Sequence, residues 1–143
     1  MINLEEDFIV KFKLIQLEIK RVGAWIISLR PHQPTLGACV ITLNRECEKL
    51  SNITEQEGAE LTLAFKEIEK ILNATFKPDK INYLALMMQD NQVHFHILPR
   101  YSNDKFFENQ NFIDINWPEQ PSLEPIVIDD FLLQKILKKL KNT

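Results

Sequence analysis

Short runs of apolar or alternating residues dominate the first hundred positions of the chain and predict β-strands. Five such runs occur, at residues 12–20, 23–29, 38–43, 81–88 and 92–101. The prolines and the glycine of residues 30–37 indicate a loop, and connections this short favour antiparallel pairing over parallel crossovers. Asp90 and Asn91 tolerate the backbone angles of a tight turn, so the last two runs are expected to form a hairpin.

Two other segments carry apolar residues at helical spacing. The first begins after Thr54, which matches a capping box with Glu57 three residues later, and it stops before Pro78. Its apolar face comprises Leu61, Ala64 or Phe65, Ile68, and Ile71 or Leu72. The second spans about residues 129–141, whereas the polar residues 102–125 indicate an irregular tail. Together these elements predict an α+β domain, an antiparallel sheet of about five strands with one long helix and a C-terminal helix.

The composition fits one ordinary globular domain. We expect it to cover residues 1–143, with a core at about 12–118 and an extension that ends in the C-terminal helix. The net charge of −3 argues against a general nucleic-acid binder. No run approaches the roughly 20 apolar residues of a membrane span and no signal peptide is apparent, so a cytoplasmic protein without a membrane partner is expected. Cys39 and Cys47 lack metal-ligand spacing and are expected to be free thiols.

The stretch QVHFHILPRY at residues 92–101 holds two of the three histidines of the chain. Because side chains alternate along a strand, its residues divide into two sets on opposite faces. One set is Val93, Phe95 and Ile97, and the other is His94, His96, Leu98 and Arg100. The first set indicates core, and the second favours contact with an anionic ligand. A pair of hydrogen-bonded sheet histidines is equally open on the residues alone, and a zinc site lacks an evident third ligand because His32 lies in a distant loop.

The residues HFHILPR, in a strand that follows a helix and an antiparallel strand, resemble the motif of the histidine triad (HIT) superfamily of nucleotide hydrolases and transferases. The family motif alternates three histidines with apolar residues and often continues into Pro-Arg. Its second and third histidine positions fall on His94 and His96, and its first position falls on Gln92. The segment GACVITLNRECEKLSNIT at residues 37–54 is similar to the family's strand, turn and helix entry. The dipeptide WP at 117–118 is similar to a bacterial branch whose motif begins with glutamine.

The resemblance implies a role for each motif position. His94 would attack the α-phosphate of a nucleotide and form a covalent nucleotidyl-histidine, a step that suits a neutral imidazole. His96 would stabilise phosphate charge or assist the leaving group. Gln92 can donate and accept hydrogen bonds, but it cannot titrate near neutral pH. The resemblance also implies a homodimer, a nucleotide or nucleotide conjugate as ligand, and no metal or other cofactor.

The phosphate grip departs from the family pattern. Many relatives have a Gly-Gln-Ser/Thr segment before the motif, whereas MMQDNQVH has neither glycine nor serine and is expected to run directly from strand to strand. The three glycines of the chain are scattered, so no glycine-rich phosphate cradle exists. Other groups must then hold the nucleotide. The candidates are Arg100, Gln89, Arg30 and Ser28, with His32, Gln33 and Thr35 in the same loop as Arg30.

Three functions are consistent with these residues. The first is a nucleotide hydrolase or nucleotidyltransferase that uses His94, His96 and Gln92. The alternative is a nucleotide-binding module with little or no turnover, which Gln92 and the missing cradle favour. The third, a metal-dependent hydrolase, would contain bound metal and lose activity on chelation. No nucleic-acid partner is expected for any of them.

Overall fold

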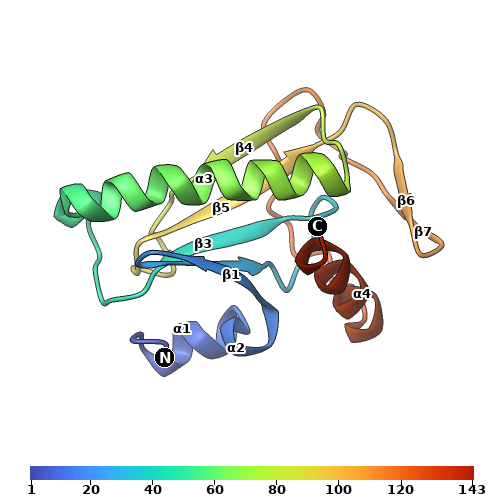
Figure 1. The fold of residues 1–143 in the computed structure, drawn as a ribbon. Helices are drawn as coiled ribbons and strands as arrows, with labels where there is room; N and C mark the ends of the chain where they lie inside the picture. Colours follow the sequence, from blue (N-terminus) through green and yellow to red (C-terminus); the bar gives the residue numbers. More distant parts are fainter.

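The computed structural model describes residues 1–143, and a five-stranded antiparallel sheet lies at its centre (Figure 1). The strands are β1 (Glu18–Val22), β2 (Trp25–Leu29), β3 (Cys39–Leu43), β4 (Lys80–Leu84) and β5 (His94–Arg100), in the order β1-β2-β3-β5-β4. All neighbouring strands pair antiparallel, as the short connections predict. Strand β5 has a partner on each side, with Val40 and Leu84 both opposite His96. The histidine strand is therefore held in the interior of the sheet.

Two helices cover one face of this sheet. Helix α3 (Glu55–Thr75) lies across the strands and α4 (Asp130–Lys141) lies near one end (Figure 1). The predicted capping box is present, because the Thr54 hydroxyl accepts from the Glu57 amide and the Glu57 carboxylate accepts from the Thr54 amide. Asp129 caps α4 by accepting from the Leu132 amide. The α+β class and both predicted helices are confirmed.

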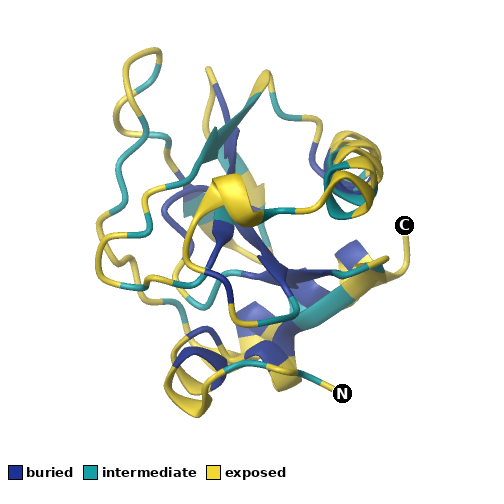
Figure 2. Cartoon of the chain, turned by 90° about the vertical axis from the view of Figure 1, so that its left-hand side faces the viewer, coloured by how far each residue is buried: buried dark blue, intermediate teal, exposed yellow.

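The main core lies between these helices and the sheet. It is a cluster of 23 buried residues, to which the strands contribute alternate side chains such as Ile27, Ile41 and Ile97. Helix α3 contributes Ile68 and Leu72 from its predicted apolar face. The central strands β2, β3 and β5 are mostly buried, whereas β1 and β4 are only partly buried and the outer surfaces of the helices are exposed (Figure 2). Both cysteines are free, as predicted, and both are buried.

The opposite face has a thinner cover. Helices α1 (Glu6–Lys11) and α2 (Leu14–Leu17) pack there in a second cluster of five buried residues, namely Phe8, Ile9, Phe12, Leu14 and Val40. A strand was expected over residues 12–20, and this interpretation is wrong for its first half. Leu14 and Leu17 are both buried at a spacing of three, which one helical turn provides, and the strand starts only at Glu18. None of the helices is long and apolar enough to cross a membrane.

Two other segments differ from the expectation. Strand β4 ends at Leu84, so residues 85–93 form a loop in place of a tight hairpin turn, and Met87 in this loop has a left-handed φ of 41°. The polar residues 102–125 contain a small hairpin of β6 (Lys105–Phe107) and β7 (Gln110–Phe112). Its two turn residues, Glu108 and Asn109, have positive φ, which is the geometry of a two-residue hairpin turn. A 3-10 turn, η1 (Leu50–Asn52), precedes α3.

Candidate active site

Strand β5 presents two histidines to the face that α1 covers. His94 and His96 are both buried, and their ring centroids lie 4.9 Å apart. The rings of Phe8 and Phe12 lie 5.4 and 5.5 Å from the His94 ring. Phe95, between the histidines, points to the other face, where it packs on Trp25. The alternation predicted for this strand is confirmed.

A main-chain carbonyl determines the tautomer of His94. Nδ1 of the ring lies 2.5 Å from the carbonyl oxygen of Gln92. A carbonyl oxygen can only accept, so Nδ1 carries the proton and the lone pair is on Nε2. Burial lowers the pKa of His94 below its usual value, which keeps the ring neutral at pH 7. The ring therefore offers an unprotonated nitrogen to any ligand in front of it.

His96 has the complementary tautomer. The Nε group of Arg30 donates to Nδ1 of His96 at 3.3 Å, so the ring proton is on Nε2. Burial, together with the positive charge of Arg30, lowers the pKa of His96 to about 3. His96 is then a neutral hydrogen-bond donor beside the acceptor nitrogen of His94. One imidazole can attack an electrophile while the other donates to an oxygen on it.

A cavity of about 570 Å³ lies in front of the two histidines, a size typical of small-molecule sites. It brings together four predicted site residues, His94, His96, Arg30 and Gln89. His32 also lines it, which corrects the expectation that this residue lies far from the histidine pair. The remaining walls come from segments that carry no motif, namely Lys11, Phe12, Pro31, Leu86, Met87, Met88, Asp90, Leu123 and Pro125. The lining combines apolar side chains with charged side chains and imidazoles.

Sequence reasoning missed Lys11, Phe12 and the C-terminal segment because only the tertiary fold brings them to the cavity. A β-bridge pairs His32 with Val127, and the main-chain N–H of Gln33 donates to the carbonyl of Ile126. These two contacts hold the segment that contains Leu123 and Pro125 beside the loop after β2. Nothing in the local sequence of either segment indicates this pairing.

Arg100 has a structural position that the sequence did not indicate. Its guanidinium makes a bidentate ion pair with Asp114, at 2.7 and 3.0 Å. It also donates to the side chain of Asn82 and to the carbonyl of Glu119. The ion pair is buried, since 4% and 2% of the two side chains are exposed. Arg100 therefore ties the segment after β7 to the sheet and does not line the cavity, which corrects its interpretation as a phosphate ligand.

Gln92 and Ser28 do not line the cavity either. The Gln92 amide nitrogen donates to the carbonyls of Leu43 and Arg45, and its oxygen accepts from the Cys47 amide. These partners lie at the end of β3 and in the turn that follows it, so the contact of Gln92 with the site is its main-chain carbonyl on His94. The Ser28 hydroxyl is fully buried, with a long contact of 3.5 Å to the carbonyl of Val40.

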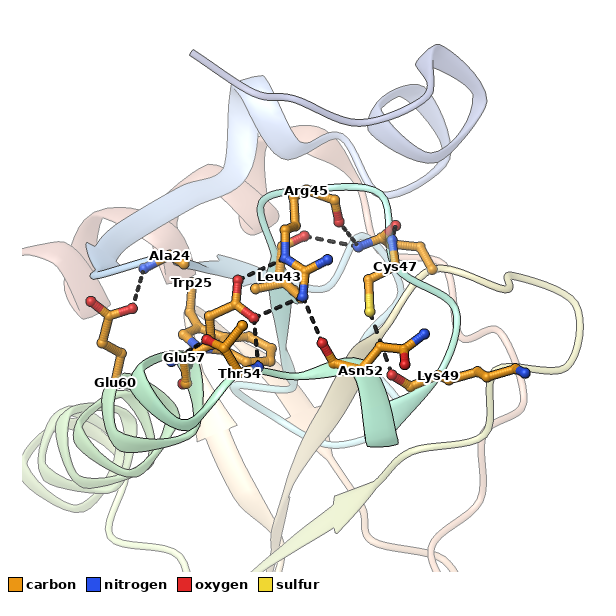
Figure 3. Close-up of polar contacts among 11 residues, drawn as sticks. Ala24, Trp25, Leu43, Arg45, Cys47, Lys49, Asn52, Thr54, Glu57 and Glu60 are labelled. Carbon is orange, nitrogen blue, oxygen red and sulfur yellow. Dashed lines mark hydrogen bonds and ion pairs between the residues drawn. The ribbon is translucent and has the colours of Figure 1, made fainter.

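The turn held by Gln92 is itself fixed to the start of α3 (Figure 3). Arg45 makes two hydrogen bonds to Glu57, at 2.7 and 2.8 Å, and one to the carbonyl of Asn52. The guanidinium of Arg45 lowers the pKa of Glu57 to about 2. The capping box of α3, the turn and the main chain before His94 thus form one connected network.

The rest of the loop after β2 supports its own backbone. The side-chain amide nitrogen of Gln33 donates to the carbonyls of Arg30 and Ala38, and its side-chain oxygen accepts from the main-chain N–H of Gly37. The Thr35 hydroxyl is buried without a hydrogen-bond partner. Of the residues considered in this loop, Arg30 and His32 reach the cavity. No group of three or more His, Cys, Asp or Glu side chains lies close enough to hold a metal ion.

Comparison with known families supplies the deciding observation. The family model described as the HIT domain matches residues 26–103, which is more than half of the chain. The chain belongs to the HIT domain family. The matched region of this HIT-domain protein runs from β2 to β5 and contains both histidines. Membership of the family supports a nucleotide-binding, hydrolase or transferase function in general terms.

Solved structures of histidine triad proteins share the fold. A HIT protein from Sinorhizobium meliloti 1021 has a TM-score of 0.77 at 17% identity, covering 99% of this chain and 96% of that one. A histidine triad protein from Bradyrhizobium japonicum has a TM-score of 0.70 at 18% identity, covering 98% and 96%. A hypothetical histidine triad nucleotide-binding protein from Sulfolobus tokodaii strain7 has a TM-score of 0.69 at 15% identity, covering 93% and 89%. No curated protein matches the sequence.

Proposed function

We propose that this HIT-domain protein hydrolyses a nucleotide conjugate, or transfers its nucleotidyl group, by attack of His94 on the α-phosphate. The observation that supports this most directly is the contact between Nδ1 of His94 and the carbonyl of Gln92. It leaves the lone pair of Nε2 available at a cavity large enough for a nucleotide. A buried, neutral imidazole with one nitrogen held by an acceptor is the form that acts as a nucleophile.

The reaction has two displacements at phosphorus. Nε2 of His94 forms a bond to the α-phosphorus, and the bond between phosphorus and the leaving group breaks. The leaving group keeps the electron pair and takes a proton from solvent. Water, or an acceptor hydroxyl in a transferase, then attacks phosphorus and loses a proton to solvent, and the phosphorus–nitrogen bond breaks with its electron pair returning to Nε2.

The other motif residues assist this chemistry without titrating. A pKa of about 3 makes His96 an electrically neutral donor at pH 7, so its Nε2–H group stabilises negative charge on the phosphate oxygens. Gln92 assists through its main-chain carbonyl, which holds His94 in the productive tautomer. Arg30 and Gln89 bind phosphate oxygens, and the nucleoside packs on apolar lining residues such as Leu123.

A nucleotide-binding module without turnover is the second candidate. It is favoured by the same geometry that ties the Gln92 amide to the turn after β3. With Gln92 occupied and His96 neutral, neither of these motif side chains supplies a proton to the leaving group near pH 7. Leaving groups that depart readily without protonation would be turned over, and poor ones would only bind.

One assay distinguishes the enzyme from the binding module. Adenosine phosphoramidate and dinucleoside polyphosphates are incubated with the wild type, with His94→Ala and with Ser28→Ala, which changes a buried residue outside the cavity. We expect mononucleotide release from the wild type and Ser28→Ala, and none from His94→Ala. Nucleotide binding without release by the wild type would favour the binding module, and release by His94→Ala would contradict the role of His94.

Two properties implied by the family resemblance stay predictions. A homodimer is expected, and sedimentation velocity at micromolar concentration would show one species of twice the chain mass. A cytoplasmic location is also expected, and fractionation of the source cells would test it.

A further inference from the structure

Lys11 and Asp90 form an ion pair in the lining of the cavity. Nζ of Lys11, at the end of α1, lies 2.7 Å from a carboxylate oxygen of Asp90, in the loop before β5. Both residues line the cavity in front of His94. Among the residues lining this cavity, Asp90 is the only carboxylate, and Lys11 and Arg30 are the only cations. The pair also borders a neighbouring cavity of about 640 Å³, so it lies where the two cavities meet.

We infer that Lys11 binds phosphate in the proposed nucleotide site, and that its ammonium group is paired with the Asp90 carboxylate while the site is empty. When a phosphate binds, the ammonium group of Lys11 leaves Asp90 and contacts the phosphate instead. This inference rests on the proposed function and adds to it the group that grips phosphate in a chain without a glycine-rich cradle. It also assigns opposite effects to the two partners of the ion pair.

The position of Lys11 supports this role. Its Nζ lies 5.8 Å from the centre of the Phe12 ring, and that ring packs 5.5 Å from His94. Phe8 also packs on His94, so α1 is anchored to the histidine it covers. Lys11 and His94 line the same cavity, and the positive charge of Lys11 acts on the pKa of the His94 ring. A charged N–H···O contact to phosphate is among the stronger hydrogen bonds in proteins.

The electrostatics of the pair favour exchange. About half of the Lys11 side chain is exposed, and a surface pair of this kind contributes little to stability, so it breaks easily. An unpaired Asp90 carboxylate repels a nucleotide phosphate, whereas an unpaired Lys11 attracts it. Removing the carboxylate should therefore improve phosphate binding, although it breaks the same ion pair as removing the ammonium.

Binding of the four common nucleoside monophosphates, and of the nucleosides without phosphate, is measured by titration calorimetry on the full chain. Lys11→Met should weaken monophosphate binding by about tenfold or more, because a charged hydrogen bond is lost. Asp90→Asn should tighten it by about threefold, because a repulsive charge is removed. Neither variant should change nucleoside binding.

The chain provides a matched control. Lys20 and Glu67 form an ion pair at 2.8 Å whose side chains are 50% and 25% exposed, against 49% and 21% for Lys11 and Asp90, and it lies outside the cavity. Lys20→Met should leave monophosphate binding unchanged. Weaker binding in both Lys11→Met and Asp90→Asn, or no change in either, would overturn the inference while the proposed function stands. A wild type that binds none of the nucleotides would overturn both.

Discussion

The two faces of the central sheet are built from the same strands and differ in almost every other respect. On the side of α3 and α4, 23 buried residues form one continuous core. On the side of α1 and α2, only five buried residues form a cluster, and the two histidines lie next to it. Consecutive residues of β3 illustrate the division, since Ile41 belongs to the first cluster and Val40 to the second.

The difference indicates a division of labour between stability and chemistry. The large core fixes the position of β5, so the histidines do not depend on their own cover for their spacing. The thin cover has a different effect, since the rings of Phe8 and Phe12 exclude water from His94 and keep it neutral. Substitutions on the core face should therefore change mainly the stability, and substitutions on the histidine face should change mainly the chemistry of the site.

The largest expected effect is on stability, from a truncation on the core face. Ile41→Ala should lower the free energy of unfolding by about 2–5 kcal/mol, because it leaves a cavity in a fully packed cluster. Val40→Ala, the matched change on the histidine face, removes fewer carbons from a smaller cluster and should cost about half as much. Urea denaturation measures both. Equal losses, or a smaller loss for Ile41→Ala, would contradict the division.

The next effect is the loss of stability in mild acid. The pKa of both histidines is lowered in the folded chain, so below about pH 6.5 the unfolded chain binds more protons and stability falls. Between pH 7 and pH 5 we expect a loss of about 2 kcal/mol from His96, whose pKa is lowered to about 3, and a further loss from His94, whose pKa is also lowered. The pKa of Glu57 is lowered from 4.5 to about 2, so its contribution to stability is lost mainly below about pH 4.5 and adds little in this range.

His96→Gln isolates the share of one ring. Glutamine can accept the hydrogen bond from Arg30 but does not titrate, so the loss between pH 7 and pH 5 should fall by about 2 kcal/mol relative to the wild type. Denaturation curves at pH 7, 6 and 5 provide the measurement. An unchanged pH dependence in His96→Gln would mean that the ring is not buried in its neutral form.

A smaller effect should appear in the pH profile of activity when the aromatic cover is opened. In Phe12→Ala, water reaches His94, its pKa rises towards the usual 6.5, and the acid limb of the rate profile moves to higher pH. Ile9→Ala is the control, because Ile9 is buried in the same cluster but does not stack on the ring. Equal shifts in both variants would show that loss of helix packing, and not exposure of the ring, is responsible.

The smallest effect is expected at Ser28, which lies under the cover but outside the cavity. Its hydroxyl makes only a 3.5 Å contact to the carbonyl of Val40. Ser28→Ala should change stability by less than about 1 kcal/mol and leave nucleotide binding unchanged. A clear loss of binding, measured by calorimetry, would return Ser28 to the site to which the sequence pattern assigned it.

Local patterns were sufficient to predict most of the fold and the centre of the site. The capping box at Thr54 and the apolar spacing of α3 are properties of neighbouring residues, and strand alternation alone places His94 and His96 on one face. The strand expected at residues 12–20 was wrong in its first half because the short run with Leu14 and Leu17 fits one helical turn as well as a strand.

The parts that could not be predicted depend on long-range contacts. Arg100 follows the motif, yet its role is decided by Asp114 in a segment without a pattern. Gln92 lies before the start of β5 at His94. Its side chain therefore bonds to the carbonyls of Leu43 and Arg45 and does not line up beside the two histidines. Lys11 and Leu123 reach the cavity from the two ends of the chain. None of these pairings has a signal in the surrounding sequence.

The central claim is that Nε2 of His94 becomes covalently linked to the nucleotide, and capture of that intermediate tests it most directly. The wild type and His94→Ala are mixed with a nucleoside phosphoramidate and quenched within the first turnover at alkaline pH, which preserves a phosphorus–nitrogen bond. Intact-protein and peptide mass spectrometry then locate any adduct. We predict one nucleotidyl group on His94 in the wild type and none in the variant. A nucleotidyl group on another residue, or mononucleotide release by His94→Ala at the wild-type rate, would contradict the claim.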